Sequence, residues 1–101
     1  MIKDVYRYGF QPNVPLEEVE ASLLLALLAT ESLHGEAQVR LDAAHFLDVD
    51  QRACVIDAGT PVGRDINRLF VGFLRREFGE DAFTVERVDS VPQLEPQEVC
   101  A

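Results

Sequence analysis

Cysteine, basic residues and long apolar runs are all scarce in this chain of 101 residues. Its two cysteines, Cys54 and Cys100, are too few for a disulfide framework, and we expect Cys54 to be a small buried residue of a strand. The longest strictly apolar run, residues 23–29, is much shorter than the about 20 residues needed to cross a bilayer. The first residues are charged and lack the apolar stretch of a signal peptide. These absences predict a cytoplasmic protein.

Acidic residues outnumber basic ones by 18 to 9 and give the chain a net charge of -9. Because nucleic acids and anionic membranes are bound by Lys and Arg that neutralise phosphates, we expect neither as a partner. Arginine is far commoner than lysine, which is typical of proteins from GC-rich bacterial genomes. With 48% hydrophobic residues and no linker or repeat, residues 1–88 are expected to form a single α+β domain, followed by a Pro-containing tail over residues 89–101.

The first third of the sequence predicts a strand and then a long helix. Residues 3–10 combine β-branched and aromatic residues with alternating charge, and their three aromatic side chains are spaced to pack under the helices. Pro15 suits the first position of a helix, and three glutamates follow it near the positive end of the helix dipole. Apolar residues then recur at i, i+3 and i+4, and Gly35 can end the helix in a left-handed conformation.

The middle of the sequence predicts a β-hairpin. Residues 37–46 alternate apolar and polar side chains, which is the period of two expected of a strand with one buried face. Asp48, Asp50 and Gln51 suit a turn, and residues 52–58 form a second, β-branched strand.

A second helix and a last strand follow. Thr60 can cap this helix, Pro61 can occupy its first position and Gly79 can close it. Gly72, in its middle, costs about 1 kcal/mol relative to alanine, so we expect it to mark a close backbone approach, either to the first helix or to a partner. With residues 82–88 as a strand, the order is β-α-β-β-α-β. Right-handed crossovers then predict a ferredoxin-like α+β sandwich, a four-stranded antiparallel sheet with two helices on one face.

Leu24, Leu25 and Leu28 lie outside the main apolar stripe of the first helix, so its middle is apolar nearly all round. Leaving three leucines in water forgoes roughly 1.5 to 3 kcal/mol each. We therefore expect a second surface to cover them, either the tail, in which Leu94 is a candidate apolar anchor, or another subunit.

Arg64, Arg68 and Arg75 project within about 40 degrees of one another at 3.6 residues per helical turn. They predict a basic stripe on an acidic molecule. The ordinary interpretation is a solvated helix face with Asp65 and Glu77 as local partners. The functional interpretation is a docking surface for an acidic protein, possibly another copy of the chain.

No motif predicts catalysis, a metal or a cofactor. The two histidines, His34 and His45, suit structural positions at the ends of a helix and a strand. Asp48 and Asp50 resemble the start of a calcium loop, but the glycine and the distant glutamate of that loop are missing. No Ser-His-Asp, Cys-His or paired-carboxylate constellation has a recognisable spacing, so the sequence favours a protein that is not an enzyme.

The sequence therefore favours a non-enzymatic protein–protein interaction or assembly subunit, an adaptor or oligomerisation module of a bacterial cytoplasmic complex. Its partner-binding residues would be the three leucines, the three arginines of the stripe and Leu94. The alternative is a small-ligand-binding or catalytic domain with a pocket between the sheet and the helices or across a dimer. Tyr6, Tyr8, His45 and Arg40 are the polar residues we expect to line such a pocket.

Overall fold

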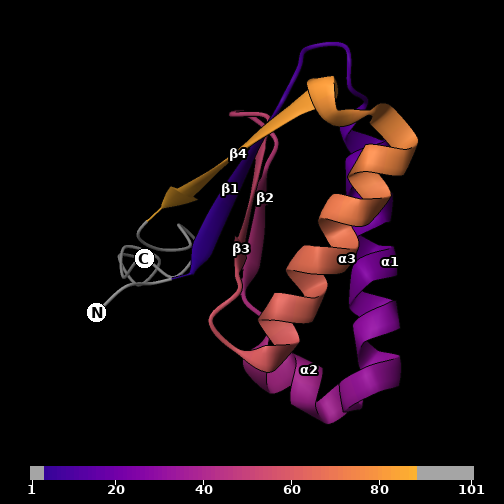
Figure 1. Ribbon diagram of the computed structural model, residues 1–101, viewed down its shortest axis with the longest axis vertical. Coiled ribbons are helices and arrows are strands. Elements are labelled where there is room, and N and C mark those ends of the chain that lie inside the picture. The colour runs from indigo at the N-terminus through magenta and orange to yellow at the C-terminus, as the bar shows by residue number, and fades with distance from the viewer. Residues whose placement is uncertain (1–3, 89–101) are drawn as a thin grey trace, which may run out of the picture.

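The computed structural model describes residues 4–88, which form an α+β domain with a four-stranded antiparallel sheet and three α-helices (Figure 1). In chain order the elements are β1 (Val5–Phe10), α1 (Leu16–His34), α2 (Glu36–Asp42), β2 (His45–Asp48), β3 (Ala53–Asp57), α3 (Pro61–Phe78), a 3-10 turn (Glu80–Ala82) and β4 (Phe83–Val88). Within this described part, no helix is both long enough and apolar enough to cross a membrane.

The sheet has the strand order β2-β3-β1-β4, and every neighbouring pair is antiparallel. The central strand β1 pairs with β3 on one side and with β4 on the other, so that Tyr8 lies opposite both Cys54 and Val85. The helices α1 and α3 lie side by side on one side of the sheet, and α2 connects the end of α1 to β2 (Figure 1). The edges of the sheet are β2 and β4.

The core lies between the sheet and the two long helices. Tyr8 and Phe10 of β1 are buried there, and the half-buried Tyr6 packs against the same cluster, as their alternation predicted. The Tyr8 ring meets Phe70 of α3 edge-on, with 5.0 Å between the ring centroids. The Tyr8 hydroxyl donates a 2.5 Å hydrogen bond to Oδ1 of Asn67, so its polar end has a partner inside the fold.

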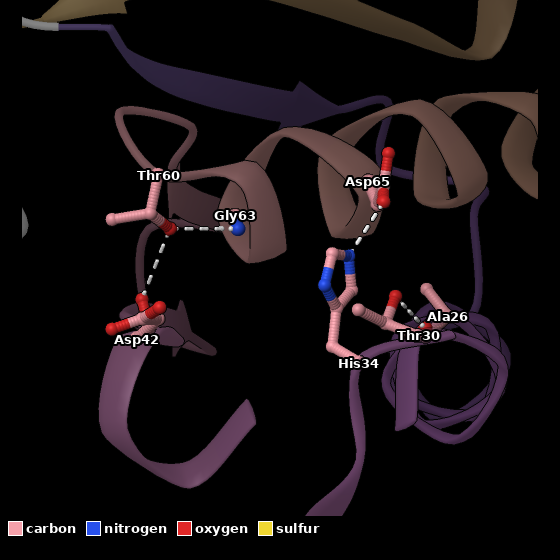
Figure 2. A network of polar contacts seen from close by, with 7 residues as sticks. All are labelled: Ala26, Thr30, His34, Asp42, Thr60, Gly63 and Asp65. Carbon is pink, nitrogen blue, oxygen red and sulfur yellow. Dashed lines mark hydrogen bonds and ion pairs between the residues drawn. The ribbon is translucent and has the colours of Figure 1, made fainter. Parts of the chain in front are cut away.

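The ends of the long helices follow the chemistry of their sequences. The hydroxyl of Thr60 accepts a 2.9 Å hydrogen bond from the amide of Gly63, and Pro61 is the first residue of α3 (Figure 2). Gly35 and Gly79, with φ of 89° each, follow the last residues of α1 and α3. Only glycine adopts this conformation without a steric cost, and so both helices stop there.

The prediction of a strand over residues 37–46 is wrong for most of its length. Residues Glu36–Asp42 form the short helix α2, and β2 has only four residues, His45–Asp48. Two i,i+4 pairs of side chains stabilise the helical turn, one of them Arg40 with Glu36 at 2.7 Å. Only Val39 is buried, because the alternating apolar residues do not share one face of a helix.

The prediction that Gly72 marks a close backbone approach to the first helix is also wrong, because a Cβ at that position would meet nothing of the described chain within 4 Å. A close approach to a partner at Gly72 stays a prediction. The close approach occurs at Gly63 instead. There a Cβ would lie 2.0 Å from the carbonyl oxygen of Asp57, at the end of β3. Gly63 therefore sets how closely the first turn of α3 packs against the sheet.

Candidate functional site

The middle of α1 exposes three leucines on the side opposite its buried residues. Leu24, Leu25 and Leu28 are 54%, 56% and 59% exposed, whereas Val19 and Ala26 are fully buried. We call these three side chains the leucine surface. Their exposure agrees with the sequence pattern, which placed them outside the main apolar stripe. The fourth apolar anchor predicted for a partner, Leu94, lies outside the described residues.

An apolar groove borders the leucine surface where α1 passes the edge strand β2. One hollow of about 370 Å³ is lined by Leu24 and Leu27 together with His45 and its neighbours on β2. A second, of about 320 Å³, is lined by Leu16, Glu17 and Glu20 of α1, by Leu47 of β2 and by Val49, which follows that strand. Burial lowers the pKa of His45 in this groove. The His45 side chain is therefore a neutral wall of the groove at neutral pH.

The charges of the two long helices are opposite. The helix α1 carries four glutamates, Glu17, Glu18, Glu20 and Glu31, and no lysine or arginine. The helix α3 carries four arginines against one aspartate and one glutamate. Its basic stripe, Arg64, Arg68 and Arg75, is exposed on the side opposite the buried residues of α3.

The arginines of the basic stripe do not pair with Asp65 or Glu77, the local partners that the sequence suggested. Asp65 lies 2.8 Å from Nε2 of His34 and so connects α3 to the end of α1 (Figure 2). Arg75 forms an exposed ion pair of 3.9 Å with Glu80, beyond the end of the helix. Within residues 4–88, Arg64 and Arg68 form no ion pair.

Arg64 and Arg68 line a cleft of about 280 Å³ between the first turns of α3 and the beginning of β1. The other lining residues are Asp4, Tyr6, Ala58 and Asn67. We call this hollow the arginine cleft. It divides the basic stripe, because Arg75 lies further along α3 and does not line it.

Two residues that line the arginine cleft, Tyr6 and Asp4, interact with Arg87 of the neighbouring strand β4. Arg87 lies over the Tyr6 ring, with its guanidinium carbon 5.8 Å from the ring centroid, and its NH2 group donates a long 3.5 Å hydrogen bond to the Tyr6 hydroxyl. The same guanidinium lies 3.7 Å from the carboxylate of Asp4. Inside the cleft, Oδ1 of Asn67 accepts from Tyr8, so the Asn67 side chain presents its amide nitrogen as a donor.

The described residues contain no arrangement typical of a metal centre or a nucleophile. Within residues 4–88, no group of three or more His, Cys, Asp or Glu could hold a metal ion. Cys54 is fully buried, as expected, and burial raises the pKa of its thiol to about 12. The thiol therefore stays protonated at neutral pH, whereas a nucleophilic cysteine is a thiolate.

The four polar residues predicted to line one pocket lie in four different places. Tyr6 lines the arginine cleft, Tyr8 is part of the core and His45 lies in the groove beside β2. Arg40 is exposed on α2, where it pairs with Glu36. Sequence reasoning missed Asp4, Ala58 and Asn67 as cleft residues, although the i, i+3, i+4 spacing of Arg64, Asn67 and Arg68 was visible.

No protein-family model matches this chain, and no curated protein or solved structure matches it either.

Proposed function

We propose that this protein is a non-enzymatic assembly subunit that associates with a second copy of itself through the outer side of its two long helices. The observation that carries this proposal is the leucine surface, Leu24, Leu25 and Leu28, each more than half exposed in the middle of α1. Contiguous exposed apolar side chains with a charged rim are typical of protein interaction sites.

The leucine surface alone supplies a modest driving force. Burying a leucine completely yields about 1.5–3 kcal/mol, so covering the exposed half of each side chain yields about 1 kcal/mol. A symmetric pair of chains covers six such leucines and gains about 6 kcal/mol by this reckoning. Association costs at least about 4 kcal/mol in lost freedom of motion. Stable association therefore needs further contacts beyond these leucines.

The opposite charges of α1 and α3 supply those contacts best when the partner is the same chain. The leucine surface shares α1 with four glutamates, and the basic stripe is exposed on the neighbouring helix α3. In a two-fold symmetric pair, a contact between two different surfaces occurs twice, once in each direction. When the two helical layers face each other, α1 of one copy can lie against α3 of the other, which brings glutamates near arginines in both halves.

The mass of the protein in solution tests this proposal. At micromolar concentration, light scattering should give at least twice the chain mass of 11.3 kDa. Leu24→Glu and Leu28→Glu should each give a folded monomer, because they place a charge in the centre of the contact. Leu41→Glu is the matched control: Leu41 is 78% exposed on α2, outside the leucine surface, so this variant should associate like the wild type.

Three results would contradict the proposal. One is a wild-type protein that stays monomeric, and another is a Leu41→Glu variant that dissociates as fully as Leu28→Glu. The third is loss of the folded circular dichroism spectrum in both leucine variants, which would assign these side chains to a core.

A truncated chain that ends at Val88 tests whether a second copy or the protein's own tail covers the leucine surface. If a second copy covers this surface, removal of residues 89–101 leaves the mass in solution unchanged. If a monomeric full chain becomes associated only after truncation, the tail was the cover and the proposal is wrong.

We also propose that the fold is a ferredoxin-like β-α-β-β-α-β sandwich with α2 inserted after its first helix. The strand order supports this assignment, since it runs β4-β1-β3-β2 when read from the β4 edge and every pair is antiparallel. The position of α1 and α3 on one side of the sheet supports it too (Figure 1). A solution structure with a helix on each face of the sheet would overturn it.

A further inference from the structure

We propose that the arginine cleft binds a small phosphate monoester, with Arg64, Arg68 and Asn67 holding the phosphate group and Tyr6 forming the opposite wall. The cleft lies between α3 and β1 and the leucine surface lies on α1, but the two proposals share Arg64 and Arg68, which also belong to the basic stripe.

The cleft gathers donors from one flank of α3. Arg64, Asn67 and Arg68 stand at i, i+3 and i+4, so their side chains emerge from the same flank of the helix. The interaction of Asn67 with the buried Tyr8 hydroxyl fixes that side chain and leaves its amide nitrogen free to donate into the cleft. Ala58, almost fully buried at the end of β3, adds a small apolar wall that leaves room for a ligand.

Neither arginine of the cleft lies within 4.0 Å of a carboxylate of the described residues, although Asp4 also lines the cleft and is paired with Arg87. Of the eight arginines, those at positions 7, 40, 75 and 87 form such ion pairs, whereas Arg52, Arg64, Arg68 and Arg76 form none within residues 4–88. Arg64 and Arg68 have no such partner within residues 4–88, and both border the same hollow. Two adjacent guanidinium groups repel each other, and an anion between them removes that repulsion.

The number of donors fits a phosphate better than a carboxylate. Each guanidinium presents its N–H groups as a planar fork that matches two oxygens, and Asn67 adds two further N–H donors. A carboxylate has two oxygens, which a single guanidinium already satisfies. A phosphate monoester has three terminal oxygens and a charge of about -1.5 to -2 at neutral pH, which matches two arginines.

The size and acidity of the protein limit the ligand to a small molecule. The cleft holds about 280 Å³, and the net charge of -9 repels a polyanion such as a nucleic acid. Asp4, which lines the cleft and lies near Arg87, places a carboxylate where a second phosphate would be repelled. The same carboxylate can accept a hydrogen bond from a hydroxyl. The chemistry of the cleft therefore points to a monoester of a small hydroxylated compound.

A nuclear magnetic resonance titration of the full chain with glycerol 3-phosphate tests this assignment. We expect saturable shifts of the backbone amides of Tyr6, Ala58 and Asn67. Inorganic phosphate and succinate are the comparison ligands, and both should bind more weakly than the monoester. Because hydrogen bonds to charged groups are worth about 1.5–3 kcal/mol, Arg64→Gln and Arg68→Gln should each weaken binding by about 10-fold or more.

Arg75→Gln is the matched control. It removes the same charge from the same helix but lies outside the cleft, so the affinity should change by no more than about 2-fold once salt screens exposed charges. Arg64→Lys keeps the charge but loses the planar fork, and it should lose most of the affinity that Arg64→Gln loses. All three arginines are exposed, so we expect each variant to fold, and a thermal melt of each variant checks this.

Four results would overturn the proposal. They are no saturable binding of glycerol 3-phosphate, equal loss of affinity in Arg75→Gln and Arg68→Gln, succinate binding as tightly as the monoester, and inorganic phosphate binding as tightly as the monoester. Repeating the titration on Leu28→Glu keeps this test independent of self-association. Unchanged or higher affinity in that variant supports a cleft that works within one chain, because dissociation leaves Arg64 and Arg68 to the ligand alone, and lost affinity in a folded Leu28→Glu monomer would contradict the proposal.

Discussion

Gly63 is the point at which α3 comes closest to the sheet, and its replacement by alanine tests that packing. The added Cβ would lie 2.0 Å from the carbonyl oxygen of Asp57 and 3.2 Å from Cα of Ala58. Both are backbone atoms, so neither can rotate away and the first turn of α3 must move. Overpacking of this kind costs about 1–3 kcal/mol, against a gain of at most about 1 kcal/mol from replacing a helical glycine. An approach of 2.0 Å to a backbone oxygen belongs at the upper end of this range, so we expect Gly63→Ala to lower the free energy of unfolding by about 2 kcal/mol after the helical gain is subtracted.

Gly72 provides the matched control in the same helix, because its Cβ would meet nothing within 4 Å. There the helix preference of alanine acts alone, and Gly72→Ala should raise the free energy of unfolding by up to about 1 kcal/mol. For a domain of this size, each kcal/mol moves the melting temperature by roughly 4–8 °C. Urea unfolding at several protein concentrations separates this effect from association. A Gly63→Ala protein as stable as the wild type, or a less stable Gly72→Ala protein, would refute the reasoning.

Three further predictions concern single side chains. Thr60→Ala removes the hydroxyl that accepts from the amide of Gly63 and should cost about 1 kcal/mol of stability, whereas Thr60→Ser should cost much less; equal losses would contradict the capping role. Arg52 has a left-handed φ of 53° and donates to two carbonyls of the loop before α1. Because hydrogen bonds to a charged group are worth about 1.5–3 kcal/mol and the left-handed conformation costs about 1–2 kcal/mol, urea unfolding should rank the wild type above Arg52→Gly and Arg52→Gly above Arg52→Ala. An Arg52→Gly protein more stable than the wild type would show that the strain dominates. Burial raises the pKa of Cys54 from 9.0 to about 12, so the stability that this thiol contributes is complete below pH 9 and is lost as the pH rises toward 12. Urea unfolding across this range should show a smaller loss for Cys54→Ala than for the wild type, and identical losses would exclude the thiol as a cause.

The sequence predicts those elements whose ends have their own chemistry. Thr60, Pro61 and Gly79 define both ends of α3, and the structure places all three where the sequence expects them. The strands β1, β3 and β4 also lie within their predicted ranges. Each of these segments is long enough, or bounded clearly enough, for its period of apolar residues to be unambiguous.

The segment over residues 36–42 was misassigned because seven residues are too few to separate a period of two from a helical period. Its apolar residues alternate as in a strand, yet Leu41 is 78% exposed and only Val39 is buried. The polar residues favour the helix, because Arg40 and Glu36 meet only when a helix brings positions i and i+4 together, although such an exposed pair contributes only about 0.3–0.5 kcal/mol.

The leucine surface shows the limit of sequence reasoning in another way. The pattern predicted apolar side chains outside the main stripe of α1, and Leu24, Leu25 and Leu28 are indeed exposed. The pattern does not say what covers these side chains, because the same sequence fits leucines that are exposed in a single chain and leucines that are buried in an assembly. Association through these residues therefore stays a prediction for the mass measurement to decide.

The arginine cleft depends on the strand register, which is the least local property of the fold. Tyr6 lies opposite Arg87 only because β1 pairs with β4 in this register, and it faces α3 only because Tyr8 and Phe10 face the core. A shift of one residue would turn Tyr6 to the other side of the sheet together with both core residues. The burial of Tyr8 and Phe10 therefore also fixes the wall of the cleft. The register of β1 positions both the core and the cleft, so a variant that keeps the core intact also keeps Tyr6 in place. Losses of ligand affinity in the Arg64 and Arg68 variants can then be attributed to the arginines themselves.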